Sequence, residues 1–413
     1  MPKTDAPALF SEEFTANPYP TYQALRENEP VACKRYAGER MQVWFVSRYE
    51  DVRAAFRDPR FRKSRESVSA GGLAKGRGNP ELAAFHRTLI MLDPPEHTTL
   101  RRLVAKEFTP RRIRAMADKA AAYADQLVAG FRPDGKAELV GQLAVPLCYH
   151  IIGGMLGSRP EDDWPGFDWN RLRVLGNRLT TPDNSATTVD YDEIKFEIKA
   201  MVEVLIARRR EHPGPDVFSA LIAATDRGEL SADQLFGLVV TLVLGGMDTT
   251  AAFLGNALLA LLLDPGQLEL LRSRPELMDK AVEELLRFDG AMQTASFRFT
   301  SEDVELGGTV IPRGAVVALT LAAANRDPGQ FPDPDRLDIT RDAKHHVALG
   351  HGIHNCLGAE LGRMLTRITL ETVLRGLPDL VLAAPPDTLD WRPGILLRAV
   401  RELPVTFTDE ESR

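Results

Sequence analysis

The residue most able to carry chemistry is Cys356, in the segment HVALGHGIHNCLGAEL, which has Gly350 and Gly352 before it. Apolar residues follow at helical spacing, so the sequence predicts a helix that begins directly after the cysteine. The free N–H groups and positive dipole end of that helix favour a thiolate, which is a ligand for a soft metal ion. The glycines permit a tight loop with room for a flat ligand above it. A small buried side chain at a helix start is the alternative interpretation.

A second candidate is the acid and hydroxyl pair Asp248 and Thr249, in LVLGGMDTTA. A buried acid beside a hydroxyl can relay protons. The Gly-Gly pair before it has no side chains, so the predicted helix is narrower at this point. Two structural roles compete with this interpretation. Thr249 can hydrogen-bond to the preceding turn, and Asp248 can pair with a structural cation.

Several charged residues have spacings that suit ion pairs or an anionic ligand. Glu284 and Arg287 are three apart in AVEELLRF, and Glu284 shares helical spacing with apolar residues, so we expect it to face inward with Arg336 as a second partner. His97 and Arg101 lie four apart on one predicted helix face, and two cations there suit a carboxylate ligand. A solvated basic face is the alternative for that pair, because charged residues follow. Arg298 falls on a predicted strand or turn with no acid partner nearby in sequence.

The element that must position the acid and hydroxyl pair is a long apolar helix from Ser231 to Leu263. Ser231 and Gln234 form a predicted capping box, and Asp264-Pro265 provides the stop. Its length would suit a membrane span, but the polar groups inside it are costly in lipid, so a buried central helix is the better interpretation. Near the middle of this helix, one face carries small and partly polar side chains, which leave space for a bulky ligand.

The remaining elements are predicted to be mainly α with small β-sheets (α+β). We expect a strand over 41–47, a helix over 49–56, helices up to about residue 290, paired strands around Gly307-Gly308 and strand segments near the C-terminus. The segment SVSAGGLAKGRGNPE is predicted to be a mobile loop. Because no repeat or interdomain linker is visible, we predict a single domain over residues 1–413.

Composition excludes several classes of protein. The 413 residues include 58 acidic and 51 Lys plus Arg side chains, and this net charge of −7 gives no general attraction to nucleic acid or to an anionic membrane. The three cysteines lie far apart, which excludes a disulfide scaffold, a paired-cysteine zinc site and a two-cysteine haem attachment motif. The N-terminal residues have no signal-peptide pattern, so we expect a cytoplasmic, monomeric protein that binds neither membrane nor nucleic acid.

Four motifs occur in an order that resembles the soluble bacterial cytochrome P450 family of haem-thiolate monooxygenases. They are GGMDTT on the long helix, EELLR, ANRDP followed by FPDPDRLDI, and GHGIHNCLG around the cysteine. The resemblance extends from PYPTYQALR to the C-terminal strands and is strongest to actinobacterial enzymes that tailor secondary metabolites. It implies a single-domain cytochrome P450 fold in which the long helix crosses a haem.

The resemblance also implies roles for individual residues. Cys356 is then the axial thiolate ligand of the iron of haem b, and Asp248 with Thr249 is the acid–alcohol pair that supplies protons for O2 activation. The cations expected to hold the haem propionates are His97, Arg101, Arg298 and His354, and further haem contacts are expected from Gly245, Leu349, Gly350 and Gly358. Glu284, Arg287 and Arg336 match a structural ion-pair triad. Leu349 stands where the family usually has Phe, which should change packing beside the thiolate.

The implied reaction inserts one oxygen atom from O2 into a hydrophobic organic substrate such as a macrolide, terpenoid or steroid-like compound. The sequence has no dinucleotide fingerprint and no cysteine cluster, so we expect electrons from NAD(P)H through a ferredoxin reductase and a ferredoxin. The expected ferredoxin-docking patch is Lys106, Arg111, Arg112 and Arg114. A solvated helix face is the alternative interpretation of these four residues. A peroxide-driven peroxygenase and a non-catalytic haem-binding protein are the alternatives. The expected substrate contacts are the segments near 66–90 and 178–195 together with Thr241, Leu244, Gly245, Thr294, Ile395 and Leu396.

Overall fold

The computed structural model describes residues 9, 11–36, 41–64, 79–158, 167–180 and 190–408. The predicted mobile loop lies mostly outside these residues, as do residues 181–189 of the second expected substrate segment. The α-helices are α1 (Glu12–Ala16), α2 (Tyr19–Asn28), α3 (Tyr49–Arg57), α4 (Glu96–Ala105), α5 (Pro110–Arg114), α6 (Ala117–Phe131), α7 (Val145–Leu156), α8 (Trp169–Thr180), α9 (Tyr191–Glu211), α10 (Val217–Asp226), α11 (Ala232–Leu262), α12 (Pro265–Ser273), α13 (Met278–Asp289), α14 (Leu321–Asn325) and α15 (Ala359–Gly376). This composition confirms the prediction of a mainly helical protein.

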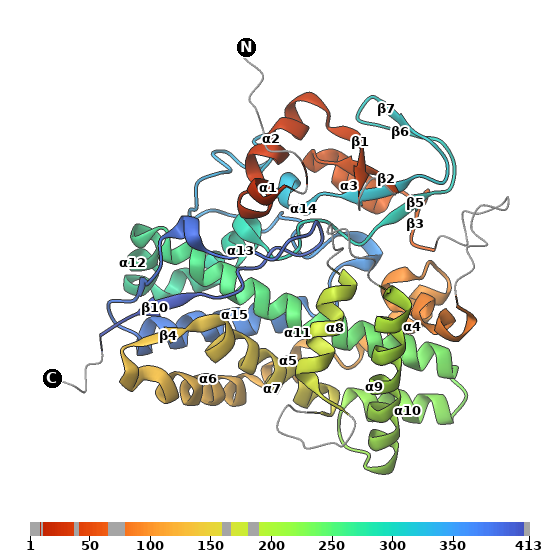
Figure 1. Ribbon diagram of the computed structural model, residues 1–413, viewed down its shortest axis with the longest axis horizontal. Coiled ribbons are helices and arrows are strands. Elements are labelled where there is room, and N and C mark those ends of the chain that lie inside the picture. Colours follow the sequence, from red (N-terminus) through yellow and green to blue (C-terminus); the bar gives the residue numbers. More distant parts are fainter. Residues whose placement is uncertain are drawn as a thin grey trace.

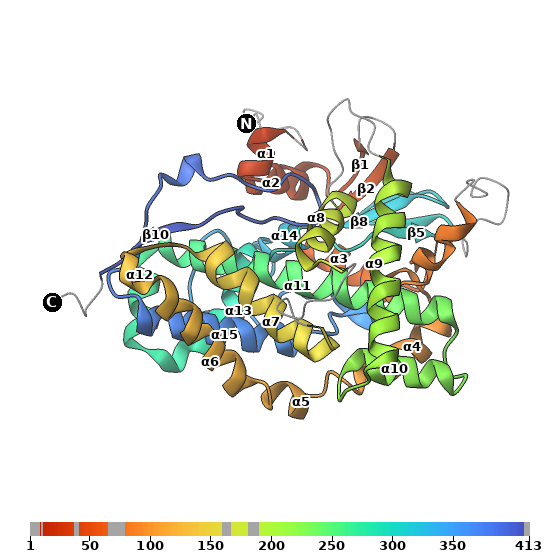
Figure 2. The ribbon, with the colours of Figure 1, turned by 60° about the horizontal axis from the view of Figure 1, so that its bottom comes forward.

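Helix α11 runs through the middle of the molecule (Figures 1 and 2). The predicted capping box is present, because Ser231 Oγ accepts from the N–H of Gln234 and Gln234 Oε1 accepts from the N–H of Ser231. Helices α7, α13 and α15 pack against α11, which explains why its sequence is apolar on nearly all sides. By length and composition α11 could cross a membrane, but most of its apolar window is buried inside the protein, as in the core helix of a soluble protein.

The strands form three small sheets. The largest has the order β1 (Val31–Tyr36), β2 (Met41–Val46), β8 (Val316–Leu319), β5 (Arg298–Thr300) and β3 (Phe61–Arg62). The second has the order β4 (Lys136–Glu138), β10 (Pro404–Thr406) and β9 (Val381–Leu382). The predicted strand pair around Gly307-Gly308 is the two-stranded sheet of β6 (Val304–Leu306) and β7 (Thr309–Ile311). Both glycines have positive φ, which L-amino acids other than Gly seldom adopt.

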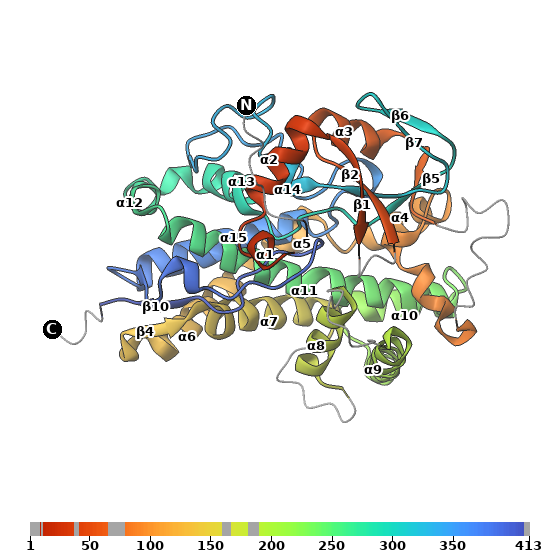
Figure 3. The same ribbon diagram turned by 45° about the horizontal axis from the view of Figure 1, so that its top comes forward.

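The arrangement places the two sides of α11 in different surroundings. Helices α8 and α9 lie on one side of α11, and the β1–β2 strand pair with α2 and α3 lies on the other (Figure 3). The segment between α14 and α15, which contains Cys356, includes one short 3-10 helix, η6 (Gly352–His354). Two further 3-10 helices, η1 (Pro80–Arg87) and η2 (Leu89–Met91), contact α11. The residues predicted to hold the haem and to deliver protons lie on α4, α11, β5 and the cysteine segment.

Candidate active site

Cys356 is held in a tight loop that ends at the start of α15. Its N–H donates to the carbonyl of Leu349 over 2.8 Å, and Gly350 and Gly352 have φ of 73° and 75°. A side chain on Gly352 would also meet the Phe56 carbonyl at 3.0 Å, so both backbone angle and space require glycine there. Cys356 is exposed as a residue. The surrounding protein still shields its thiol from water and thereby raises its pKa, although the Gly358 N–H and the charges of Arg101 and Arg363 act in the opposite direction.

Buried basic nitrogens without partners gather near this loop. His97 is 2% exposed, and neither of its ring nitrogens has a hydrogen-bond partner among the described residues. Nε2 of His354 and Nε of Arg298 are likewise unpartnered within the described part of the chain. The rings of His97 and His354 lie 4.1 Å apart between centroids. Since buried donors without partners are rare in folded proteins, these groups indicate a site for an anionic ligand.

The pKa of His354 reflects this accumulation of positive charge. Burial, followed by repulsion from His97, Lys63, Arg298 and Arg101, lowers it to about 2. Arg101 connects helix α4 directly to the cysteine loop, because its Nη2 donates to the carbonyl and to Oδ1 of Asn355 over 2.7 and 3.0 Å. The structure therefore brings together all four basic residues that the sequence predicted for this site.

Sequence analysis missed a fifth basic residue, Lys63. Its side chain is buried, and its Nζ donates to the carbonyl of Ser296, to Ser296 Oγ and to the carbonyl of Phe297 over 2.7, 2.5 and 2.9 Å. Burial and the charge of Arg298 lower its pKa well below the usual range of a lysine. The sequence around Lys63, FRKSRES, resembles an ordinary charged surface segment, so no pattern distinguished this lysine.

These residues fit a haem. Cys356 would hold the iron, and His97, Arg101, Arg298 and His354 would hold the two propionates. On α11, Gly245 is exposed although the helix is central, and a methyl group added to it would meet no atom within 4 Å. Gly358 likewise has open space beside its Cα. The described residues contain no cluster of three or more His, Cys, Asp or Glu side chains that could hold a metal ion instead.

The acid–alcohol pair has well-defined partners. Asp248 Oδ2 lies 2.6 Å from Nη1 of Arg392, and Nη2 of the same guanidinium donates to Oδ1 of Asn177 over 2.5 Å. The Thr249 hydroxyl donates to the carbonyl of Gly245 over 2.8 Å. Both structural interactions that competed with proton relay in the sequence are thus present, and Arg392 is the cation that the sequence did not identify.

The predicted ion-pair triad is partly wrong. Glu284 and Arg287 are fully buried and form a two-point ion pair, with 2.7 Å between Oε2 and Nε and 2.8 Å between Oε1 and Nη2. The further cation is Arg341, whose Nε lies 3.1 Å from Glu284 Oε1. Arg336 is exposed and contributes only its carbonyl, which accepts from Arg287 and Arg341. The reason is geometric. Arg336 ends the turn that begins at Asp333, and Arg341 ends the next, which begins at Asp338. The N–H of Asp338 donates to Glu284 Oε1 over 3.0 Å and so holds the second turn beside α13.

Two of the expected substrate contacts, Thr294 and Ile395, are fully buried in this structure, so their contact with a substrate remains a prediction. Thr294 is fully buried and donates to the carbonyl of Ile395, and Ile395 itself is fully buried beside Val43 and Phe45. Thr241, Leu244 and Leu396 are half-buried, and Thr241 Oγ1 accepts from the N–H of Leu89 over 2.9 Å.

The exposed apolar side chains near α11 include Ile90, at the end of the expected substrate segment 66–90, and two residues that had not been predicted from the sequence, Met91 and Val174. Ile90 and Met91 of η2 are 45% and 40% exposed, and Val174 of α8 is 43% exposed. Because both elements contact α11, these residues are candidates for contacts with an apolar ligand.

Comparison with known proteins agrees with this site. The family model described as "Cytochrome P450" matches residues 188–399. The chain is 39% identical to the cytochrome P450 monooxygenase PikC of Streptomyces venezuelae, over 98% of this chain and 94% of that protein. It is 38% identical to the vitamin D(3) 25-hydroxylase of Pseudonocardia autotrophica, over 98% of this chain and 97% of that protein. The crystal structure of the myxobacterial cytochrome P450 CYP267B1 in complex with myristic acid covers 97% of this chain and is itself covered to 98%, with a TM-score of 0.88 and 31% identity. The fold and the resemblance predicted from the sequence are therefore confirmed, and the chain belongs to the cytochrome P450 family of haem- and O2-dependent monooxygenases.

Proposed function

We propose that this enzyme transfers one oxygen atom from O2 to a hydrophobic organic molecule, with electrons from NAD(P)H through a reductase and a ferredoxin. The observation that carries this proposal is the set of unpartnered buried nitrogens of His97, His354 and Arg298 beside the thiol of Cys356. A thiolate-ligated haem, when bound, supplies O2 activation. The residues of the chain bind this group, exclude water and deliver protons.

Proton delivery is assigned to Asp248 and Thr249. The Thr249 hydroxyl lies next to the exposed Gly245 in the middle of α11, where small side chains leave space. Asp248 precedes Thr249 on α11, is half-buried and is held by Arg392, so it is the carboxylate proposed to supply protons to this part of the helix. Thr249→Ala should retain O2 consumption but lower the fraction of electrons recovered in product.

The proposed substrate is a medium-to-large apolar compound such as a macrolide, terpenoid or steroid-like molecule. The half-buried Leu244 and Leu396 and the exposed Ile90, Met91 and Val174 are apolar, and apolar walls select by shape. One related protein is named as a vitamin D(3) 25-hydroxylase, and its named substrate is a steroid-like compound. Hydroxylation is the proposed reaction.

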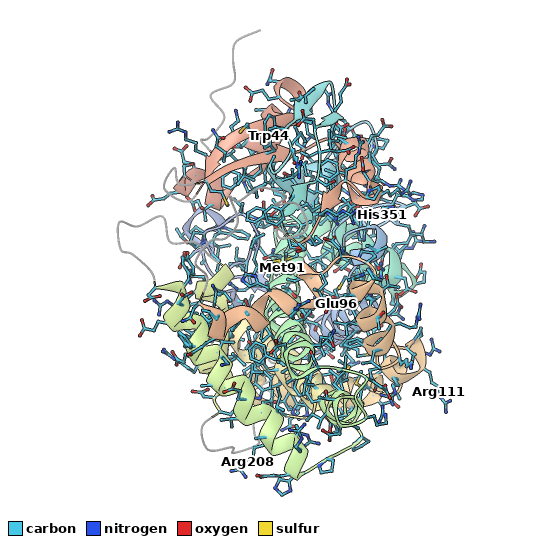
Figure 4. The ribbon with its side chains drawn as sticks, turned by 90° about the vertical axis from the view of Figure 1, so that its right-hand side faces the viewer. Trp44, Met91, Glu96, Arg111, Arg208 and His351 are labelled. Atoms are coloured by element: carbon cyan, nitrogen blue, oxygen red, sulfur yellow. The ribbon has the colours of Figure 1, made fainter. Side chains whose placement is uncertain are left out.

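Electron supply is proposed to use the basic patch of Lys106, Arg111, Arg112 and Arg114. All four side chains are exposed, and α5 packs against α15, the helix that follows Cys356. In Figure 4, Arg111 projects from the same side of the molecule as His351 of the cysteine loop. Arg112 is paired with Glu107, which leaves the other three to attract an acidic ferredoxin.

The proposal is tested first by the absorption spectrum of the dithionite-reduced protein under carbon monoxide. A strongly red-shifted Soret band is expected, and a band at the position typical of imidazole-ligated haem would contradict Cys356 as the ligand.

Product formation is then compared with a ferredoxin system and with hydrogen peroxide. Turnover with peroxide alone, unaffected by Thr249→Ala, would favour the peroxygenase instead. A ferredoxin reduction rate independent of ionic strength would contradict the docking patch.

A further inference from the structure

Glu283 precedes Glu284 in α13 but has a different set of partners. Its carboxylate accepts from Arg363 at two points, with 2.6 Å between Oε1 and Nε and 3.1 Å between Oε2 and Nη2. His346 approaches the same carboxylate, with 3.1 Å between Nε2 and Oε2. The side chains of Glu283 and His346 are 15% and 2% exposed, so this cluster is largely shielded from water.

His346 has contacts on both sides of its ring. The N–H of Ala348 lies 3.1 Å from Nδ1, and Nε2 faces the Glu283 carboxylate. The guanidinium of Arg363, which contacts the same carboxylate at two points, is a permanent cation that balances its charge.

The cluster encloses the cysteine loop in sequence. His346 lies ten residues before Cys356, and Arg363 lies seven residues after it on α15. One carboxylate on α13 thus fixes both ends of the segment that presents the thiol. The next residue after the histidine, Val347, is also held, because its N–H donates to Oδ1 of the buried Asn325 over 2.8 Å.

The cluster also controls charge beside the thiol. Arg363 is one of the cations that act to lower the pKa of Cys356. Although burial alone would raise the pKa of Glu283, the hydrogen bonds from His346 and Arg363 and the positive charges of these two residues hold that pKa at about 2, so the carboxylate is ionised at neutral pH. The negative charge of Glu283 therefore offsets the positive charge that Arg363 presents to the sulfur.

We infer that Glu283 is a positioning residue that fixes both ends of the cysteine loop and, by neutralising Arg363, sets the reduction potential of the iron bound to Cys356. This inference rests on the proposed haem-thiolate function. A positive charge near the thiolate favours the reduced state of the iron, because reduction adds negative charge there. Removal of the Glu283 charge should therefore raise the potential.

The test measures the midpoint potential of the haem-loaded protein and of Glu283→Gln by spectroelectrochemical titration. Glu360→Gln is the matched control, because Glu360 also contacts Arg363, over 3.1 Å, but is 58% exposed and screened by water. We expect a higher potential in Glu283→Gln and no change in Glu360→Gln. An unchanged potential in Glu283→Gln, or an equal rise in both variants, would overturn the assignment.

A second pair of variants tests the loop while the charges of Glu283 and Arg363 are retained. His346→Leu removes the donor to Glu283, so the red-shifted carbon monoxide band should be lost severalfold faster on warming, whereas His346→Gln, which retains an N–H donor, should restore most of the parental lifetime. Equal lifetimes in all three proteins would contradict the positioning role.

Absence of the red-shifted band in the unaltered protein would contradict the proposed function itself and this inference with it. An intact band with an unchanged potential would contradict only the role of Glu283.

Discussion

Arg392 binds Asp248, with 2.6 Å between Nη1 and Oδ2, and so connects the C-terminal segment to the middle of α11. The same guanidinium reaches Asn177 of α8, so one side chain joins three elements that are distant in sequence. The side chains of Arg392 and Asp248 are 11% and 19% exposed, and an ion pair this well shielded keeps more of its attraction than a surface pair does.

Asp248→Asn and Arg392→Gln should therefore show strong coupling in a double-mutant cycle. We expect a coupling free energy of about 1–3 kcal/mol in the free energy of unfolding, because a charged hydrogen bond is broken in a partly buried site. The measurement is chemical denaturation followed by circular dichroism. Asp390 and Arg401 provide the control, since they form a pair in the same segment at 73% and 49% exposure. Their coupling should be below about 1 kcal/mol, and equal values for the two pairs would show that Arg392 does not stabilise the fold through Asp248.

Arg341 and Arg336 allow a direct test of the corrected ion-pair cluster. Arg341→Ala removes a cation 3.1 Å from the buried Glu284 and should lower the free energy of unfolding by about 2 kcal/mol. Arg336→Ala leaves the backbone carbonyl that accepts from Arg287, so it should change stability by less than about 0.5 kcal/mol. Thermal unfolding of the two variants side by side gives the answer. A larger loss in Arg336→Ala would restore the prediction made from the sequence.

These two arginines show where sequence reasoning succeeds and fails. The pair Glu284 and Arg287 was predictable because a spacing of three on a helix fixes which side chains meet. The choice between Arg336 and Arg341 depended on an irregular turn that no periodic pattern describes. Arg392 was missed for a similar reason, because its partner is 144 residues away and only the folded chain brings them together. The capping box, the long helix and the strand pair at Gly307-Gly308 were predictable because each depends on local sequence alone.

The low pKa of Glu283 predicts how stability depends on pH. In the folded protein this pKa is about 2, against an ordinary value of 4.5, so below pH 4.5 the unfolded chain takes up a proton that the folded chain does not. The stabilisation from Glu283 is fully present above pH 4.5 and is lost as the pH falls toward 2. Acid titrations of unfolding free energy should show a smaller decrease over this window in Glu283→Gln than in the unaltered protein. Parallel curves for the two proteins would contradict the assigned pKa.

The unpartnered nitrogens of His97 and Arg298 predict how tightly the haem is held. Both side chains are buried, and each is expected to donate a hydrogen bond to a haem propionate. A charge-assisted hydrogen bond of this kind contributes about 1.5–3 kcal/mol. His97→Ala and Arg298→Ala should therefore release haem to an excess of an apoprotein acceptor about 10- to 100-fold faster than the unaltered protein. Arg102→Ala is the matched control, because Arg102 lies on the same helix as His97 but is exposed. If all three variants released haem at the parental rate, the basic cluster would have to bind a different anion, since burying several cations without a counter-charge is too costly for a structural role alone.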